Sequence, residues 1–334
     1  MFKKIIIIAE AGVNHNGRVD NAIKLIDEAA KSGADYVKFQ HTNPELISPI
    51  AQKASYQIKN TKNNESQKNM ISKLHIKDWN KAYKILLNRC KLKKIKFLTS
   101  AFSSDDFLIV NRLKSDLIKI PSGEIVNTEL LETISKSKKK ILLSTGMANV
   151  GEIKNAINIL TKYNPLKRIT LLHCISEYPT SFENINLQSI RFLKKKFRID
   201  IGFSDHSLDI EAPIAAVAIG ATVIEKHFTL SKKMKGPDHK ASLEPKEFSL
   251  MVAKIRNIEK AMGKYEKKPT KQELVTSYLV RQSIHAKTNI KKGEKFTSKN
   301  LYLMRPYDGL PASNLKKLYN KFSKKNFHKY DPIK

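Results

Sequence analysis

One local pattern recurs eight times in the first 260 residues: a short apolar, β-branched run, a polar segment, and a stretch with amphipathic helical spacing. The apolar runs predict strands at Ile5–Ala9, Tyr36–Gln40, Lys96–Ser100, Leu117–Ile120, Lys140–Thr145, Ile169–Cys174, Asp200–Ser204 and Thr222–Lys226. Helices are predicted most clearly at Asn21–Ala30, Asn80–Cys90, Val150–Leu160, Ile210–Ala218 and Phe248–Met262. Eight such alternations in about 250 residues predict an α/β fold, a closed (β/α)8 barrel, because open doubly wound sheets usually have fewer strands.

The rest of the chain predicts a linker and a small second domain. We place the barrel at residues 1–262, the linker at 263–277 and the second domain at 278–334. The stretch Gly263–Glu273 is charged and contains proline, as linkers often do. Short strand-like runs follow, with a turn at Lys292-Gly293-Glu294 and a strand that ends at Arg305-Pro306. About 60 residues barely support an independent core, so we expect this domain to pack on the barrel or on a partner chain.

The segment between Gln40 and Trp79 is longer than an ordinary connection, and Gln, Lys, Asn and Ser dominate it. A long polar insertion of this kind is typical of a lid or a binding loop.

The charge balance raises nucleic acid as a candidate partner. Lys and Arg total 62 against 31 Asp and Glu, which gives a formal net charge of +31. The basic residues are mostly lysines scattered along the whole chain, and the sequence has no Arg-rich stripe with interleaved aromatic residues. We therefore expect solvated basic surfaces rather than a nucleic-acid site. A positive field would also concentrate anionic substrates around the protein.

Cysteine usage and hydropathy exclude other classes. Cys90 and Cys174 have no metal-type spacing, so we expect ordinary buried thiols. The apolar run Ile5–Ala9 is interrupted by Glu10 and is far too short for a membrane span or a signal peptide. We expect a cytoplasmic protein without membrane contact.

Polar side chains lie at the carboxyl end of strand after strand, where barrel enzymes carry their active sites. These candidates are Glu10, Lys38, Gln40, Ser100, Lys119, Ser122, Ser144, Ser176, Tyr178, Ser204, His206, Glu225 and His227, with Asp238 close behind the last strand. Because parallel strands of a barrel end on the same face, we expect these side chains to converge on one mouth.

Two histidines among them suggest a metal site. His206 and His227 end adjacent predicted strands, where two imidazoles can share one divalent ion and leave positions for substrate oxygens and water. A lone histidine pair is often structural, but the matched positions favour ligands. Two nitrogen ligands beside carboxylates favour an octahedral ion, Mn²⁺ first and Mg²⁺ or Co²⁺ as alternatives, over a closed Zn²⁺ site.

Two strand lysines suggest an anion site. Lys38 and Lys119 are costly to bury without an anionic partner, which a phosphate or carboxylate would supply. Serine hydroxyls at 100, 122, 144 and 204 could join them, although any one of these could simply cap a helix. Glu10 is our candidate for orienting or deprotonating a water or a sugar hydroxyl. Gln40 and Tyr178 could bind sugar hydroxyls, although Tyr178 could equally be a packing aromatic.

Taken together, these segments resemble the sialic acid synthases, a family that includes legionaminic and pseudaminic acid synthases. The matching segments are Ala9–Gly17 (AEAGVNHNG), Val37–Gln40 (VKFQ), Lys119–Glu124 (KIPSGE), Ser144–Met147 (STGM), Leu172–Cys174 (LHC), Glu177–Thr180 (EYPT), Gly202–His206 (GFSDH), Glu225–Phe228 (EKHF), Gly236–His239 (GPDH) and Arg305-Pro306.

The resemblance implies a barrel followed by an antifreeze-like (SAF) domain, in a domain-swapped homodimer whose small domains cover the partner's active site. It implies a divalent metal on His206 and His227, and phosphoenolpyruvate held by Lys38, Lys119 and the serines at 122, 144 and 204. Catalytic roles fall to Glu10, His227 and Asp238. The other substrate-binding candidates are Gln40, Ser100, Ser176, Tyr178, Glu225 and Arg305, and Arg305 would reach the N-acetyl carbonyl of the sugar across the dimer.

The implied reaction joins phosphoenolpyruvate to an N-acetylated amino sugar, after which water adds and phosphate leaves. N-acetylmannosamine, giving N-acetylneuraminate, is the first expectation. The alternative is 2,4-diacetamido-2,4,6-trideoxymannose, giving N,N'-diacetyllegionaminate, because both Glu177-Tyr178-Pro179 and Tyr56–Asn60 suit either sugar. From another class, a basic nucleic-acid-binding protein would explain the charge but not the residues at the strand ends.

The chain departs from the family pattern at two places. Ala101 stands where relatives usually carry proline, and Ile175-Ser176 stands where they carry an Asn and a Thr. Contacts to phosphate or sugar are expected to differ there, and a barrel that has lost activity is a further alternative.

Overall fold

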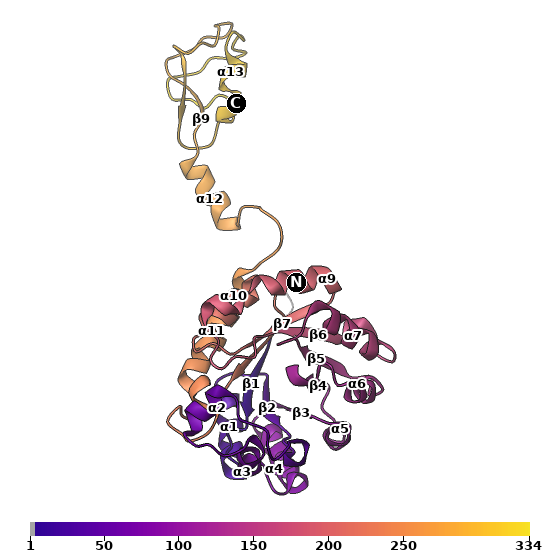
Figure 1. Cartoon of the computed structure of the whole chain (residues 1–334). Helices are drawn as coiled ribbons and strands as arrows, with labels where there is room; N and C mark the ends of the chain where they lie inside the picture. Colours follow the sequence, from indigo (N-terminus) through magenta and orange to yellow (C-terminus); the bar gives the residue numbers. More distant parts are fainter. Residues whose placement is uncertain (1–3) are drawn as a thin grey trace. The chain divides into compact units, whose positions relative to one another are not determined.

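The computed structural model describes residues 4–334, which divide into a first compact unit that ends at Lys264 and a second that begins at Tyr265. The first unit is a closed barrel of eight parallel strands in sequence order, with β8 paired to β1 (Figure 1). The strands are β1 (Ile6–Gly12), β2 (Tyr36–Gln40), β3 (Lys96–Ser100), β4 (Leu117–Ile120), β5 (Lys140–Ser144), β6 (Ile169–His173), β7 (Asp200–Asp205) and β8 (Val223–His227). The predicted barrel is confirmed.

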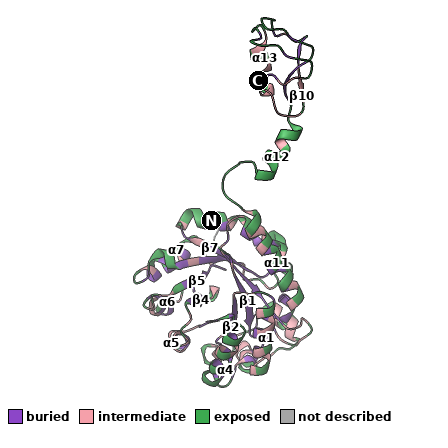
Figure 2. Ribbon diagram, turned by 180° about the vertical axis from the view of Figure 1, so that it is seen from behind, coloured by how far each residue is buried: buried purple, intermediate pink, exposed green. Residues whose placement is uncertain are grey.

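Helices surround the barrel and turn their apolar faces toward it (Figure 2). They are α1 (Val19–Lys31), α4 (Trp79–Leu92), α5 (Ser104–Asn111), α6 (Thr128–Ser135), α7 (Val150–Thr161), α8 (Phe182–Ile185), α9 (Gln188–Phe197), α10 (Glu211–Ala218) and α11 (Pro245–Ala261). In α1, for example, Ala22, Leu25, Ile26 and Ala29 are buried, which is the spacing of one helical face. No helix within residues 4–334 is long and apolar enough to cross a membrane.

The alternation of strand side chains explains where the polar residues lie. Inward-facing residues of the strands form one apolar layer inside the barrel: Ile8, Tyr36, Leu98, Leu117, Leu142, Leu172 and Val223. Side chains two positions further along a strand point to the same side. Those next positions are Glu10, Lys38, Ser100, Lys119, Ser144, Cys174 and Glu225. The candidate site is therefore the next layer of side chains inside the barrel, on the carboxyl side of the apolar layer.

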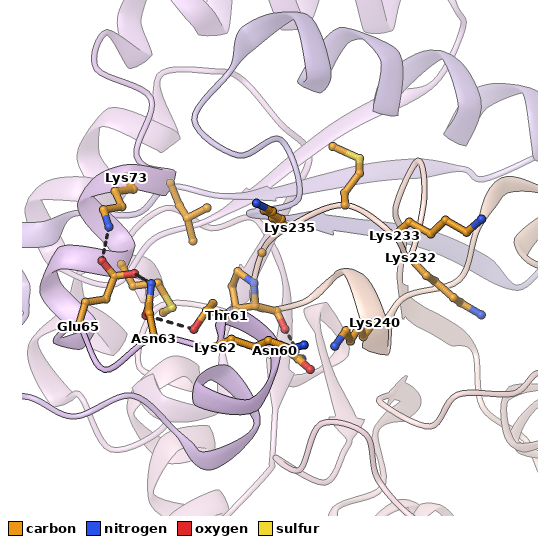
Figure 3. A pocket seen from close by; sticks show the side chains of 15 residues that line it. Asn60, Thr61, Lys62, Asn63, Glu65, Lys73, Lys232, Lys233, Lys235 and Lys240 are labelled. Carbon is orange, nitrogen blue, oxygen red and sulfur yellow. Dashed lines mark hydrogen bonds and ion pairs between the residues drawn. The ribbon is translucent and has the colours of Figure 1, made fainter.

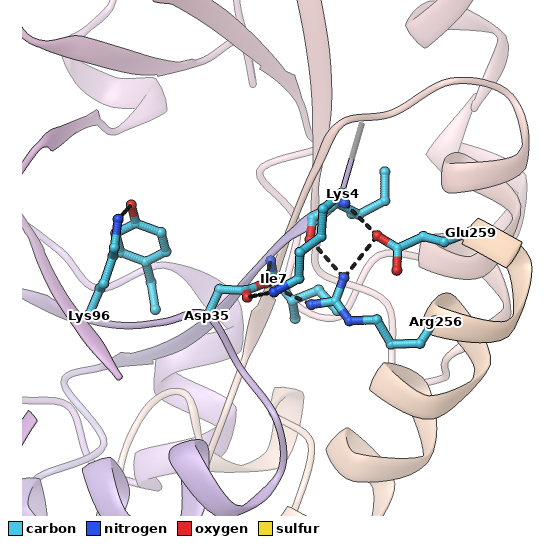
Figure 4. A network of polar contacts seen from close by, with 8 residues as sticks. Lys4, Ile7, Asp35, Lys96, Arg256 and Glu259 are labelled. Atoms are coloured by element: carbon cyan, nitrogen blue, oxygen red, sulfur yellow. Dashed lines mark hydrogen bonds and ion pairs between the residues drawn. The ribbon is translucent and has the colours of Figure 1, made fainter. Parts of the chain in front are cut away.

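A polar network ties the amino-terminal side of β1 to α11 (Figure 4). The Asp35 carboxylate accepts hydrogen bonds from Lys4 Nζ (2.7 Å), from the backbone N–H of Ile7 (3.0 Å) and from Arg256 Nη2 (2.8 Å). Arg256 Nη1 also donates to Glu259 Oε1 (2.9 Å), and the same oxygen accepts from the backbone N–H of Ile5. These contacts hold the first strand against the last barrel helix, at the end of β1 opposite to Glu10.

The segment between β2 and α4 is ordered rather than a plain loop. It forms η1 (Pro44–Leu46), α2 (Ser55–Thr61) and α3 (Gln67–Leu74). The sequence pattern missed α2 because the helix has no buried residue and hence no apolar stripe. The buried Lys53 ammonium fixes the segment by donating to Thr61 Oγ1 (2.8 Å) and to the backbone carbonyl of Asn63 (2.7 Å).

The first helix of the second unit is α12 (Lys271–Val280), which crosses the predicted boundary between linker and domain at residue 277. Thr270 and Glu273 form a capping box at its start, a signal that the charged composition obscured. An antiparallel pair follows, β9 (Ser283–Ala286) and β10 (Leu301–Met304), with η5 (Ala312–Asn314) and α13 (Leu315–Leu318). The small core of this unit contains Ile284, Ala286, Ile290, Phe296, Leu301, Phe327 and Ile333.

Candidate active site

The strand ends enclose an inner chamber of about 260 Å³ at the barrel mouth. Its walls include thirteen of the predicted site residues: Glu10, Lys38, Gln40, Ser100, Lys119, Ser122, Ser144, Ser176, Tyr178, Ser204, His206, Glu225 and His227. Phe102, Pro121, Gly123, Met147 and Cys174 complete the lining. The predicted convergence on one mouth is thus observed, while the role of each residue stays a prediction.

Two predicted residues lie elsewhere. Asp238 is buried in the segment between β8 and α11 and is not part of the inner chamber wall. Burial, and then the charge of Glu10, raise the pKa of Asp238 to about 7. Arg305 belongs to the second unit, where it is exposed directly after β10. Its assignment to the sugar stays a prediction.

Four buried charges form the floor of the inner chamber. Lys38 Nζ lies 2.9 Å from Glu10 Oε2 and 3.5 Å from Glu225 Oε2, and Lys119 Nζ lies 3.5 Å from Glu225 Oε1. Ser204 Oγ donates to the same oxygen of Glu225 at 2.9 Å. Each of the two lysines therefore has a carboxylate partner. The sequence analysis did not predict which carboxylate pairs with which lysine.

The pKa shifts of this group follow from burial and pairing. Burial disfavours the charged form of Lys38, but Glu10 and Glu225 outweigh it and raise its pKa. Burial also disfavours ionised Glu225, but Lys119 and Lys38 lower its pKa to about 2. Burial lowers the pKa of Lys119, with Glu225 opposing, so Lys119 is the less compensated of the two cations.

Several polar atoms of the chamber lack an internal partner. The buried hydroxyls of Ser100 and Ser144 make no hydrogen bond within residues 4–334. Ser122 Oγ accepts from the backbone N–H of Gly146 at 3.1 Å. Since buried polar groups in native proteins are nearly always paired, these hydroxyls are available to a polar ligand or to water.

Gly146 is required by the close packing here. A Cβ atom at this position would lie 2.4 Å from Ser176 Oγ and 2.8 Å from Ser122 Oγ. Any side chain would displace the serines that face the chamber.

The two predicted metal ligands, His206 and His227, lie close together, although no group of three or more His, Cys, Asp or Glu side chains that could hold a metal ion is found among residues 4–334. Their ring centroids are 5.6 Å apart, and both side chains are buried. His206 Nδ1 donates to the backbone carbonyl of Ile175 (2.5 Å), which leaves Nε2 as the lone-pair nitrogen, and His227 Nδ1 has no hydrogen-bond partner among the described residues. Burial lowers the pKa of His206 to about 4 and that of His227 well below its usual value. Both imidazoles are neutral at pH 7, the form that binds metals.

An outer chamber of about 660 Å³ adjoins the inner one. The two chambers share Ser176 and Tyr178, and the outer wall adds Ala54, Ser55, Tyr56, Lys59, Asn60, Glu177, Pro179, Leu208, Lys240 and Ala241. The ring of Tyr178 stacks on that of His206 with centroids 4.1 Å apart. Tyr178 therefore stands at the passage between the chambers, directly beside the histidine pair.

A third pocket, of about 610 Å³, is lined by several lysines together with Asn60, Asn63 and Glu65 (Figure 3). It lies between residues 60–74 and the segment 232–240, and its lysines are Lys62, Lys73, Lys232, Lys233, Lys235 and Lys240. Asn60 and Lys240 also line the outer chamber, so the two pockets are neighbours. Six of the basic residues therefore line one pocket beside the outer chamber, and two of them are paired, Lys73 with Glu65 and Lys232 with Glu247.

The sequence analysis named Tyr56–Asn60 only as a segment that suits either sugar, and it did not assign Met147 or Cys174 to the site. Cys174 lies two residues beyond Leu172 of the interior layer, so strand alternation was a usable signal for it. The position of Tyr56 on a helix was not predicted, because α2 has no buried residue and therefore no apolar period.

Comparison with known proteins agrees with this arrangement. The model of the NeuB family matches residues 25–267. The chain is 49% identical to the N,N'-diacetyllegionaminic acid synthase of Campylobacter jejuni over 99% of both chains, and 39% identical to that of Legionella pneumophila over 92% of this chain and 87% of the relative. A crystal structure of the N-acetylneuraminic acid synthetase of Leptospira borgpetersenii superposes with a TM-score of 0.73 at 34% identity, over 82% of this chain and 90% of the other. Both the barrel and its sequence motifs thus place this chain in the NeuB family.

Proposed function

We propose that the chain condenses phosphoenolpyruvate with 2,4-diacetamido-2,4,6-trideoxymannose to give N,N'-diacetyllegionaminic acid and phosphate. Two relatives with 49% and 39% identity carry the name of this activity. The sequence motifs left this sugar open as the alternative to N-acetylmannosamine. The similarity to legionaminic acid synthases over nearly the whole chain makes it the better choice.

The observation that carries the proposal is the inner chamber itself. An incompletely paired ammonium group, Lys119, and two unpartnered hydroxyls, Ser100 and Ser144, share the chamber with two neutral imidazoles. A small molecule with a phosphate and a carboxylate would satisfy the ammonium groups and the hydroxyls. Phosphoenolpyruvate has both groups on three carbons and suits a chamber of about 260 Å³.

His206 and His227 would hold a divalent ion, for which Mn²⁺ is our first choice. When bound, such an ion supplies Lewis-acid polarisation of a carbonyl oxygen. Tyr178, stacked on His206, would orient the sugar aldehyde toward this position. In the reaction a bond forms between the methylene carbon of phosphoenolpyruvate and the aldehyde carbon, water adds at the resulting cation, and phosphate leaves.

Glu10 would orient that water and take its proton. Its Oε1 accepts from Gln40 Nε2 at 3.0 Å, and its Oε2 faces the Lys38 ammonium at 2.9 Å. These two contacts fix the carboxylate toward the chamber. A carboxylate held in this way can orient the water and take its proton.

We keep the domain-swapped homodimer as part of the proposal. Arg305 is exposed on the second unit, so its guanidinium group is accessible to a sugar bound by another chain. Sedimentation of the full chain, together with activity measured after mixing an Arg305→Ala chain with a His206→Ala chain, would test this arrangement.

The decisive assay follows phosphate release from phosphoenolpyruvate in the presence of Mn²⁺ and one acetamido sugar. We expect release with the trideoxy sugar at a higher kcat/KM than with N-acetylmannosamine, and a product of the mass of N,N'-diacetyllegionaminic acid. His206→Ala and removal of the ion with a chelator should each abolish release. Preference for N-acetylmannosamine would contradict the choice of sugar, and release unaffected by His206→Ala would contradict the metal site.

A further inference from the structure

The second unit contains a buried histidine, His285, whose two ring nitrogens both face oxygen atoms. The residue belongs to β9 and is only 2% exposed. Its Nδ1 lies 3.0 Å from the backbone carbonyl oxygen of Tyr330. Its Nε2 lies 2.9 Å from Ser283 Oγ and 3.2 Å from Asp308 Oδ1. The proton on each nitrogen can be assigned from these partners.

The hydroxyl of Ser283 fixes the direction of its contact with His285. Its oxygen lies 2.8 Å from the backbone carbonyl oxygen of Pro306, and a carbonyl can only accept, so the hydroxyl proton is used there. The backbone N–H of Gly309 donates to the same hydroxyl oxygen at 3.0 Å. Because Ser283 has a single proton, its contact with the ring requires a proton on His285 Nε2.

The other ring nitrogen requires a proton as well. The carbonyl of Tyr330 has none to donate, so His285 Nδ1 donates to it. Either neutral tautomer would leave a bare ring lone pair against the Tyr330 carbonyl or the Asp308 carboxylate. Apart from its contact with the ring, the buried Asp308 Oδ1 has no hydrogen-bond donor among residues 4–334. The contacts therefore assign an imidazolium to His285, with Asp308 as its counter-charge.

The other titratable side chains on the surrounding segments leave this assignment unchanged. They are those of Tyr302, Arg305, Tyr307, His328, Lys329, Tyr330 and Asp331. Tyr302 lies opposite His285 in the pair of β9 and β10, and a phenol is neutral near pH 7. Asp331 Oδ2 accepts from the backbone N–H of His328 at 2.6 Å. Asp308 is thus the carboxylate that the structure pairs with the imidazole.

The imidazolium holds the loop of residues 305–309 against β9. The loop contributes Asp308 to Nε2, and Ser283 bonds to its backbone at Pro306 and Gly309. The fit is close, because a Cβ atom at Gly309 would lie 2.6 Å from the backbone oxygen of Ile284. Loss of either ring proton would turn a donor into a lone pair that faces an acceptor. The contacts between the loop and β9 would then weaken.

We infer that His285 is a positively charged positioning residue, which holds the loop that presents Arg305. The importance of this loop for catalysis rests on the proposed function, in which the exposed Arg305 reaches the sugar. His285 itself touches no substrate in that scheme. The charge of the ring and its hold on the loop can be measured without any turnover.

Nitrogen-15 NMR spectra of the full chain labelled at histidine test the charge. Spectra recorded from about pH 5.5 to about pH 8.5 cover the range in which imidazoles titrate. The His285→Gln variant identifies the signals of the buried ring, and His328→Gln identifies those of an exposed histidine in the same unit. We expect both nitrogens of His285 to carry protons at the acidic end. A ring with one unprotonated nitrogen over the whole range would overturn the inference.

Hydrogen exchange of the peptide that contains residues 305–309 tests the hold on the loop. At acidic pH, exchange should be roughly tenfold faster in His285→Gln than in the unaltered protein, and unchanged in His328→Gln. Asp308→Asn removes the counter-charge at constant size, so it should speed exchange similarly and gives the answer if His285→Gln folds poorly. Unchanged exchange in Asp308→Asn would overturn the inference.

Kinetics connect the loop to the reaction. With Mn²⁺ and the trideoxy sugar, His285→Gln should lower kcat/KM for the sugar roughly tenfold at acidic pH and little at basic pH, with the KM for phosphoenolpyruvate unchanged. A loss that is the same at every pH would contradict positioning by charge. Absence of phosphate release in the unaltered protein would instead refute the proposed function, while the spectra and exchange rates would still decide the charge of His285.

Discussion

The buried pair between Lys226 and Asp205 supports the end of β7, directly before His206. Both side chains are fully buried, and Lys226 Nζ donates to Asp205 Oδ2 at 2.5 Å. The ammonium also donates to the backbone carbonyls of Ser207 and Asp209, at 2.5 and 2.9 Å. This one ammonium therefore fixes the backbone that follows β7.

Lys226→Met removes that ammonium and leaves the Asp205 carboxylate buried without its cation. Loss of one partner from a buried pair costs about 3–5 kcal/mol of unfolding free energy. Asp205 keeps hydrogen bonds from the backbone N–H and the hydroxyl of Ser207, both at 2.9 Å, so we expect the lower end, about 3 kcal/mol.

Urea unfolding followed by tryptophan fluorescence would measure the change. Trp79 is the single tryptophan of the chain and is buried in the barrel unit, so the signal reports the barrel and not the second unit. The matched control is Lys162→Met at the exposed pair with Glu132, where no measurable change is expected. A loss below about 1 kcal/mol for Lys226→Met, or full additivity with Asp205→Asn, would refute the reasoning.

Three further predictions concern the site and its surroundings. Gly146→Ala should raise the KM for phosphoenolpyruvate about tenfold, because the added Cβ atom displaces Ser122 and such overpacking costs about 1–3 kcal/mol. An unchanged KM would contradict the close contact between position 146 and Ser122. Folding raises the pKa of Asp238 to about 7, so the folded state holds a proton that the unfolded chain releases, and stability from this group falls as pH rises from about 4 through 7. The free energy of unfolding of Asp238→Asn, measured by urea titration, should therefore rise relative to that of the unaltered protein as pH increases over this range. A difference in unfolding free energy that does not change with pH would contradict the prediction. Lys235→Glu should lower kcat/KM for phosphoenolpyruvate severalfold at low ionic strength and little at about 0.5 M salt, whereas an equal effect at both would exclude attraction by the lysine pocket.

The barrel and the inner chamber could be predicted because both depend on local alternation. An apolar residue such as Leu142 faces the barrel interior, so Ser144 two positions later must face it too. The same rule brings Lys38 and Lys119 together from different strands, without any knowledge of their partners.

Other features depend on contacts that no local pattern records. Tyr56 reaches the site because Lys53 and Pro237 hold a polar helix in place, and these contacts join segments far apart in sequence. The pairing of Lys38 with Glu10 and of Lys119 with Glu225 likewise depends on side-chain reach across strands. The start of α12 was predicted as linker because its charged composition hid the capping box at Thr270.

The geometry of the four buried charges shows which lysine has unused hydrogen-bond donors. An ammonium group has three donors, and contacts of 3.5 Å are too long for strong hydrogen bonds. Lys38 uses one donor on Glu10 at 2.9 Å, whereas Lys119 has Glu225 at 3.5 Å and the backbone carbonyl of Ile120 at 3.4 Å. Glu225 thus compensates the charge of Lys119 without occupying its donors. Under the proposed function, an anion in the chamber would gain hydrogen bonds from Lys119 while Glu225 stays in place, because Ser204 Oγ donates to Glu225 at 2.9 Å.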